Sequence, residues 1–244
     1  MEKSFREIEI VEAEIVDNRN RKMKNITDVT VAKKKKISNE NIKYFYEDEL
    51  QVIFERANES DRIIYRLLYE TATRVNEILD LRFQDVRYDR QNKRNIVLLK
   101  NLKQRKQATK EVIISDNLKN EISEFQKEHK LSNDDYVCRN YHYVKKTKEI
   151  KIKKMTDRTL NRHLIKLCEK INDEYDYINI SRDKMHTHTF RHTRAIDTLN
   201  AGADLEFVRR LLGHTNIGST AIYLKYANSK FFEKSAEINK KLGL

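Results

Sequence analysis

The sequence predicts a mostly helical α+β fold that carries a small antiparallel sheet. After residue 44, apolar residues recur at helical spacing through most of the chain, as residues 46–57 and 156–171 illustrate. The period changes between residues 83 and 115, where the segments 95–100 and 110–115 are rich in Ile and Val. Such residues favour strands, so we expect these two segments to form a sheet beside the helices.

Capping residues divide the helical part into separate elements. We expect Ser60 to begin one helix, Thr156 or Asp157 another, and Asp204 a third. Gly202 and Gly213 follow helical runs, and glycine is common just past a helix end. A loop or hairpin is expected at residues 139–154, and helices at residues 46–57, 61–68, 116–129, 156–171, 188–201, 205–212 and 229–242.

The composition favours a polyanionic partner. The 244 residues include 50 Lys and Arg against 38 Asp and Glu, which gives a formal charge of +12. Because Lys and Arg displace counterions from phosphates, nucleic acid is the expected partner, and a basic protein without one is the alternative. Cys138 and Cys168 make no disulfide framework or zinc motif, which indicates a reducing compartment. Lacking an apolar run of about 18 residues or a signal-peptide pattern, the protein is expected in the cytoplasm, with no membrane partner.

The first residues differ from the rest in charge. They carry a dense set of basic side chains, namely Arg19, Arg21, Lys22, Lys24 and the run from Lys33 to Lys36. One interpretation is a basic arm that follows a DNA backbone, and the other is a solvated, disordered tail. We expect a partly disordered basic arm at residues 1–43 and one folded domain at residues 44–244.

The segment from His188 to Tyr223 has the residues of a phosphate site, and it reads HTFRHTRAIDTLNAGADLEFVRRLLGHTNIGSTAIY. His188 and Arg191 are three residues apart, so they share one helix face. His214 ends the sequence LLGH, and Tyr223 follows nine residues later. Three groups that bind phosphate near one phenol predict an enzyme that attacks DNA with a tyrosine.

This segment resembles the H-x-L-R-H … LLGH … T…Y block of the tyrosine recombinase (phage integrase) family, which includes the Xer-type enzymes. A second segment, TATRVNEILDL at residues 71–81, resembles the family's T-G-L-R-x-x-E-L-L-x-L. The resemblance covers about residues 44–228. It implies a catalytic domain with a small three-stranded antiparallel sheet. It also implies a C-terminal exchange helix that docks into a neighbouring protomer, with Phe231 and Phe232 as anchors unless they pack on their own chain.

The resemblance further implies the catalytic residues. Arg74 and Arg191 would hold the non-bridging oxygens of one phosphodiester, a task that suits the forked guanidinium better than lysine. Tyr223 would attack phosphorus and form a 3′-phosphotyrosyl link, and a lysine would protonate the leaving 5′-oxygen. Lys106 is our choice for that lysine, Lys100 is second, and Lys103 and Lys110 are also in range. The implied set is Arg74, Lys106, His188, Arg191, His214 and Tyr223.

The implied chemistry needs no cofactor. The covalent link keeps the energy of the phosphodiester bond, so neither a metal ion nor ATP is expected. His188 and His214 would transfer a proton or bind the phosphate. Glu77 and His192 also match family positions and are interpreted as structural, whereas His186 is unexplained. The implied partner is double-stranded DNA, bound by a homo-oligomer that is a dimer on each site and a tetramer in synapsis, with accessory proteins as further candidates.

The sequence departs from the family pattern in three ways. Ala72 replaces a usual glycine, and Thr187 replaces a frequent proline. Only 43 residues precede the resemblance, which is too few for the separate domain with which two-domain relatives clamp DNA.

Several alternatives stay open. A telomere resolvase or a type IB topoisomerase-like enzyme would share the chemistry and differ in its products. A DNA-binding accessory protein would use the fold without cleavage, although the intact residue set counts against it. His186, His188 and His192 could instead hold a metal, but no carboxylate or cysteine lies at ligand spacing. The outcome of recombination, whether integration, excision, inversion or dimer resolution, is also open.

Overall fold

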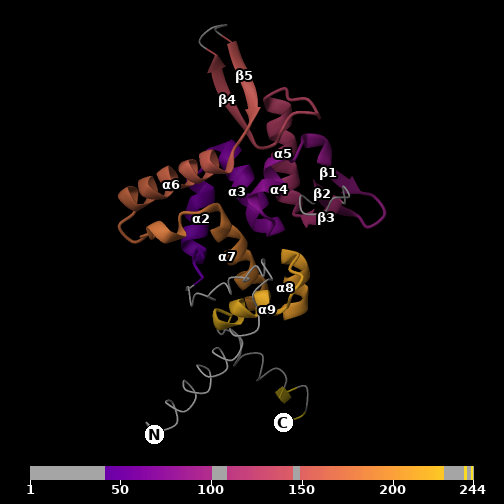
Figure 1. Ribbon diagram of the computed structural model, residues 1–244, viewed down its shortest axis with the longest axis vertical. Coiled ribbons are helices and arrows are strands. Elements are labelled where there is room, and N and C mark those ends of the chain that lie inside the picture. Colours follow the sequence, from indigo (N-terminus) through magenta and orange to yellow (C-terminus); the bar gives the residue numbers. More distant parts are fainter. Residues whose placement is uncertain (1–41, 101–108, 145–148, 228–238, 241–242, 244) are drawn as a thin grey trace, which may run out of the picture. The chain divides into compact units, whose positions relative to one another are not determined.

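The computed structural model describes residues 42–100, 109–144, 149–227, 239–240 and 243. In these ranges helices predominate and one antiparallel sheet has three strands, so the predicted fold class is confirmed (Figure 1). The arm predicted at residues 1–43 and the helix predicted at residues 229–242 lie almost wholly outside these ranges, and both stay predictions. None of the described helices is long and apolar enough to cross a membrane.

Three helices begin the folded domain: α2 (Glu47–Arg56), α3 (Glu59–Thr71) and α4 (Val75–Leu79). The side chain of Asn58 accepts a hydrogen bond from the Asp61 amide at 3.0 Å and caps α3. The prediction that Ser60 begins this helix is therefore wrong. Asn58 is an equally good capping residue two positions earlier, and the helix starts there.

The sheet follows a short 3₁₀ turn, η1 (Phe83–Asp85), and consists of β1 (Val86–Asp89), β2 (Arg94–Lys100) and β3 (Thr109–Ile114). Both pairs are antiparallel with β2 in the middle, and Val97 lies opposite Val86 on one side and Val112 on the other. The predicted strands correspond to β2 and β3. β1 has the sequence VRYD with one aliphatic residue, so composition did not single it out.

A helix and a hairpin separate the sheet from the last helices. Ser115 caps α5 (Asp116–Glu128) by accepting from the Leu118 amide, and Thr156 caps α6 (Asp157–Glu174). Between them, β4 (Arg139–Val144) and β5 (Glu149–Lys154) pair antiparallel. This hairpin extends away from the helices in Figure 1. Of the two structures that the sequence allowed at residues 139–154, the hairpin is the observed one.

The motif segment from His188 to Tyr223 folds as consecutive helices. After a 3₁₀ turn, η2 (Arg182–Lys184), the chain forms α7 (Thr187–Asn200), α8 (Leu205–Leu212), α9 (Gly218–Ala221) and η3 (Ile222–Lys225). Asp204 caps α8 through the Phe207 amide at 2.6 Å. Gly213 ends α8 with a φ of 64°, a left-handed conformation that glycine adopts without strain. Both predicted boundaries of α8 are confirmed.

Two hydrophobic clusters hold these elements together. Phe190 lies in the larger cluster, where it is fully buried and its ring stacks on Tyr65 with the centroids 5.1 Å apart. The smaller cluster joins the turn after α3 to α7, α8 and η3, and consists of Ala72, Ala195, Ile196, Val208, Leu212 and Tyr223. Because this small core includes Tyr223, the packing of α7 against α8 determines where the phenol lies.

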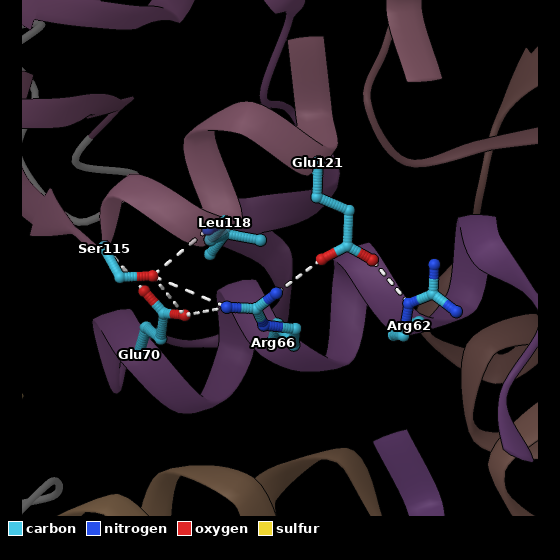
Figure 2. A network of polar contacts seen from close by, with 6 residues as sticks. All are labelled: Arg62, Arg66, Glu70, Ser115, Leu118 and Glu121. Carbon is cyan, nitrogen blue, oxygen red and sulfur yellow. Dashed lines mark hydrogen bonds and ion pairs between the residues drawn. The ribbon is translucent and has the colours of Figure 1, made fainter. Parts of the chain in front are cut away.

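Surface ion pairs connect α3 to α5 (Figure 2). Glu121 accepts from Arg62 at 2.5 Å and from Arg66 at 2.6 Å. Glu70 accepts from both the backbone amide and the hydroxyl of Ser115, and it also pairs with Arg66 at 3.1 Å. The arginines on this side of the domain are thus neutralised by carboxylates. Each such pair is worth at most about 1 kcal/mol, so their effect is to orient α5 and not to drive folding.

The stacked position of Phe190 makes its substitution costly. Phe190→Ala should lower the free energy of unfolding by about 3–5 kcal/mol, because it leaves a cavity among aromatic rings. Urea unfolding followed by circular dichroism would measure this change. Ile113→Ala, on the exposed face of β3 with 55% of Ile113 accessible, is the matched control and should stay within about 0.5 kcal/mol. Equal losses for the two variants would contradict this account of the core.

Candidate active site

One face of α7 carries the central residues of the site. His188, Arg191 and His192 lie three or four residues apart, so helical geometry places them together. His186 precedes them as the N-cap, and its Nδ1 accepts from the His188 amide at 3.2 Å. This cap gives His186 a structural role that the sequence did not reveal. Among the residues that the structure describes, no group of His, Cys, Asp and Glu has the geometry of a metal site.

Arg191 is a buried cation that backbone carbonyls hold in place. Its Nη1 donates to the Ala72 carbonyl at 2.5 Å and its Nη2 donates to the Leu212 carbonyl at 2.6 Å, while only 5% of the residue is exposed. Burial, together with the charge of Arg74, lowers the pKa of Arg191 to about 10. The guanidinium therefore stays charged at neutral pH, and an anion would gain by approaching it.

The backbone conformation at Ala72, which contacts Arg191, is unusual. Ala72 ends α3 with a φ of 50°, in the left-handed region. A residue with a Cβ adopts that region at a cost of about 1 kcal/mol or more, which explains why the family pattern has glycine there. Ala72 nevertheless keeps the turn, and its carbonyl still accepts from Arg191. The departure from the family pattern thus leaves the contact intact.

Arg74 stands at the start of α4 and is oriented by Glu77. The Arg74 amide donates to Glu77 Oε2 at 3.1 Å, and the Arg74 guanidinium lies 3.7 Å from Glu77 Oε1. About a third of the Arg74 side chain is exposed. Glu77 therefore caps the helix and aligns the arginine at the same time, which agrees with its interpretation as a structural residue.

His214 follows Gly213 and completes the polar contacts of Arg191. Its Nε2 lies 3.2 Å from Arg191 Nη2, and its Nδ1 lies 3.0 Å from the Thr220 hydroxyl. Because a guanidinium only donates, Nε2 must be the acceptor and the ring hydrogen must be on Nδ1. Burial and the charges of Arg191 and Arg74 lower the pKa of His214 to about 4, so the ring is neutral at pH 7.

Tyr223 lies at the other end of this cluster and is 2% exposed. Its Oη is 2.8 Å from Nδ1 of His192. Burial raises the pKa of Tyr223, and the nearby charge of Arg191 offsets part of that rise. The phenol is thus protonated at neutral pH, and it needs help to become a nucleophile.

A cavity of about 560 Å³ opens beside Arg74 and His214. Lys110 enters it from β3, and its Nζ donates to the Leu211 carbonyl at 2.9 Å. Burial lowers the pKa of Lys110, as do the charges of Arg191 and Arg74. Lys100, at the end of β2, lines the same cavity, whose full lining is Arg74, Glu77, Leu99, Lys100, Lys110, Leu212, Gly213, His214, Thr215 and Ser219.

The structure places five of the six predicted site residues in one cluster. Arg191 contacts His214 directly, and electrostatic effects of Arg191 reach His188 and Tyr223. Lys106 lies outside the described residues, so its assignment stays a prediction. Sequence reasoning missed the contact of His192 with Tyr223. Its four-residue spacing from His188 was the available signal, since that spacing repeats one helix face.

Comparison with known proteins identifies a family and similar sequences. A model of the phage integrase family matches residues 43–230. The tyrosine recombinase XerC of Staphylococcus epidermidis is 29% identical over 193 residues, which cover 77% of this chain and 58% of that relative. The chain therefore spans less than two thirds of the length of this curated relative.

Two solved structures share the fold. A structure of the XerH site-specific recombinase bound to a palindromic difH substrate has a TM-score of 0.61 at 19% identity, and the match covers 89% of this chain and 57% of that chain. A structure of the Tn1549 transposon integrase with transposon right end DNA has a TM-score of 0.58 at 16% identity, with 85% and 68% covered.

The buried histidines should make stability depend on pH. Burial, with the charges of its neighbours, lowers the pKa of His192 to about 4, as for His214, whereas the pKa of an unfolded histidine is near its usual value of 6.5. The unfolded chain therefore binds more protons between these values, so the free energy of unfolding should fall as pH drops from about 6.5 to about 4. Urea unfolding at pH 7.5 and pH 5 would measure the drop.

In the variant His192→Phe the free energy of unfolding should fall less between pH 7.5 and pH 5 than in the unsubstituted chain, because one of the two histidines with a lowered pKa is gone. The same substitution at His129, a half-exposed residue at the end of α5, is the control and removes a histidine outside the site. Comparison with that control cancels the carboxylates that titrate in every variant. Equal pH dependence in the two variants would contradict the assignment.

Proposed function

The chain belongs to the phage integrase family, and from that premise we propose that it is a site-specific DNA recombinase that cleaves and rejoins strands through Tyr223. The observation that carries the proposal is the buried charge of Arg191. Among the described residues it is held by carbonyls and pairs with no carboxylate, and it lies in one cluster with Arg74 and the phenol. Such a site favours an incoming phosphate.

In the proposed reaction the two arginines bind the non-bridging oxygens of the scissile phosphate. Arg191 offers a fixed fork, and Arg74, aligned by Glu77, offers a second one. The Tyr223 oxygen attacks phosphorus and loses its proton, and the bond from phosphorus to the 5′-oxygen breaks. The leaving oxygen takes a proton and becomes a 5′-hydroxyl. The 3′-phosphotyrosyl link keeps the bond energy, so a 5′-hydroxyl from a partner strand reverses the step.

The neutral histidines act through hydrogen bonds. At neutral pH His214 adds no charge to the site, because its pKa is about 4, and burial also lowers the pKa of His188. The charge of Arg191 contributes to the lowered pKa of both rings. We assign them to hydrogen bonding of the phosphate and to orientation of Arg191.

A lysine is proposed as the general acid that protonates the leaving 5′-oxygen. Lys106, which the family resemblance favours, comes between β2 and β3 in the sequence and is outside the described residues. Lys100 and Lys110 line the cavity beside Arg74, which supports either as a candidate. Lys110 has the additional feature of a pKa that burial lowers, and a depressed pKa eases proton donation at neutral pH.

The proposed partner is double-stranded DNA, acted on in the cytoplasm by a homo-oligomer, with a dimer on each site and a tetramer in synapsis. The related structures are bound to a difH substrate and to transposon right end DNA, which supports DNA as the substrate class here. Accessory proteins and the C-terminal exchange helix belong to the same proposal. The named relatives are recombinases and an integrase, which favours strand exchange over a telomere resolvase, a topoisomerase or a non-cleaving accessory protein.

The first test needs no known target. Negatively supercoiled plasmid, incubated with the protein without metal or ATP, should become relaxed and carry a protein–DNA adduct that survives denaturation. Tyr223→Phe should abolish the adduct and leave DNA binding unchanged, because the phenyl ring still fills the small core. Tyr226→Phe is the matched control, since the Tyr226 hydroxyl accepts from the Ile42 amide at 2.7 Å and lies outside the proposed chemistry.

Adduct from Tyr223→Phe, or its loss in Tyr226→Phe, would contradict the choice of nucleophile. If no adduct forms on plasmid, the assay is repeated on DNA that flanks the gene. Binding to both DNAs without adduct would favour the non-cleaving accessory protein.

A second test identifies the general acid. On a duplex with the cleavage site mapped from the adduct, a bridging 5′-sulfur in place of the 5′-oxygen leaves without a proton, because thiols are far more acidic than alcohols. Alanine variants of the four lysines in range, namely Lys100, Lys103, Lys106 and Lys110, are compared on the two duplexes. The variant that loses about 100-fold or more in rate on oxygen and regains it on sulfur has lost the general acid. Rescue of none of the four would remove lysine from this role.

A further inference from the structure

The hydroxyl of Tyr223 depends on one side chain. Within the part of the chain that the structure describes, the hydrogen-bond partner of its Oη is Nδ1 of His192, at 2.8 Å. The phenol is 2% exposed, so water does not take the place of that partner. A buried hydroxyl left without a partner costs about 1–3 kcal/mol. The position of the phenol oxygen is therefore tied to the position of the His192 ring.

The direction of this hydrogen bond follows from the charge of the ring. Burial and the neighbouring His188 and Arg191 hold the pKa of His192 near 4, so the ring is neutral at pH 7. A neutral ring has one nitrogen with a free lone pair, and the buried phenol must donate its hydrogen. Nδ1 of His192 is thus the acceptor, the ring hydrogen is on Nε2, and the Tyr223 hydroxyl is the donor.

The acceptor belongs to the same helix turn as the groups proposed to bind phosphate. His192 directly follows Arg191 and lies one turn beyond His188, and the rings of His188 and His192 have their centroids 6.2 Å apart. The centroids of the His192 and Tyr223 rings are 5.7 Å apart. A single rigid helix therefore carries both the anion site and the group that holds the phenol, which fixes the distance between them.

We infer that His192 is a positioning residue for the nucleophile: its Nδ1 accepts the phenolic hydrogen of Tyr223 and holds the oxygen beside Arg191, ready for the phosphate. This inference rests on the proposed function of Tyr223 and gives His192 a task beyond the packing role that the sequence indicated. When the oxygen attacks, the same nitrogen is an acceptor within hydrogen-bond distance for the proton that the phenol must lose.

The test compares two substitutions at position 192. His192→Phe keeps a ring of similar size and removes the acceptor. His192→Asn places an amide oxygen close to the position of Nδ1 and keeps an acceptor with less volume. The rate of adduct formation on supercoiled plasmid, measured in a single turnover, should fall about 100-fold in His192→Phe, as expected when a reacting group is misplaced by about 1 Å. His192→Asn should recover to within about tenfold of the unsubstituted protein.

A packing role predicts the opposite order, since the smaller asparagine leaves a void and the phenyl ring does not. DNA binding and the urea midpoint of both variants are measured alongside, and His129→Phe controls for the loss of a histidine elsewhere. Rates for His192→Phe that equal or exceed those of the unsubstituted protein, or a greater loss in His192→Asn than in His192→Phe, would overturn the inference.

A readout on the DNA-free protein separates this inference from the proposed function. With tyrosines labelled with carbon-13 at Cζ, the Tyr223 resonance is identified by its absence in Tyr223→Phe. It should shift in His192→Phe and return toward its original position in His192→Asn. Absence of adduct from the unsubstituted protein would count against the proposed function. A normal adduct together with an unmoved resonance in His192→Phe would count against His192 alone.

Discussion

The structure of the site depends on how Arg191 is buried. A guanidinium removed from water needs its donors satisfied, and here the acceptors are the carbonyls of Ala72 and Leu212 and the ring of His214. These groups come from the turn after α3 and from the end of α8 with the loop that follows it, so the Arg191 side chain joins α7 to two other segments of the chain. A carboxylate partner would have stabilised the charge and cancelled it, whereas carbonyls orient the cation and leave its charge for a ligand.

Charged side chains neutralise one another between α3 and α5, whereas the site keeps a positive charge. Between α3 and α5 each arginine has a carboxylate, and the local charge is close to zero (Figure 2). In the site, Arg74, Lys110 and Arg191 influence one another, and Glu77 is the acid that acts on all three. The histidines add no charge of their own, because burial beside cations keeps them neutral. The net field of the site is therefore positive, which suits a phosphodiester.

The sequence predicted the features that depend on the preferences of single residues, such as helix ends and strands. The cap at Asp204, the end of α8 at Gly213 and the strands β2 and β3 follow from single-residue preferences, and the structure has them. The predicted cap at Ser60 is wrong because Asn58, two residues earlier, caps the helix instead. The composition of β1 did not predict a strand, because β1 depends on its pairing with β2 and not on strand-favouring residues. The spacing of His192 from His188 indicates the right helix face, but the contact of His192 with the phenol depends on how η3 packs against α7, which no local pattern determines.

The carbonyls that hold Arg191 have a consequence for how this site changes over evolutionary time. A backbone oxygen is the same chemical group whichever side chain its residue carries, so substitution at position 72 or 212 does not delete the contact. What must be inherited at position 72 is a dihedral angle, and Ala72, with a φ of 50°, still supplies it. Substitutions at position 72 that keep this dihedral angle therefore preserve the contact with Arg191. An insertion or deletion that shifts the turn by one residue would remove it.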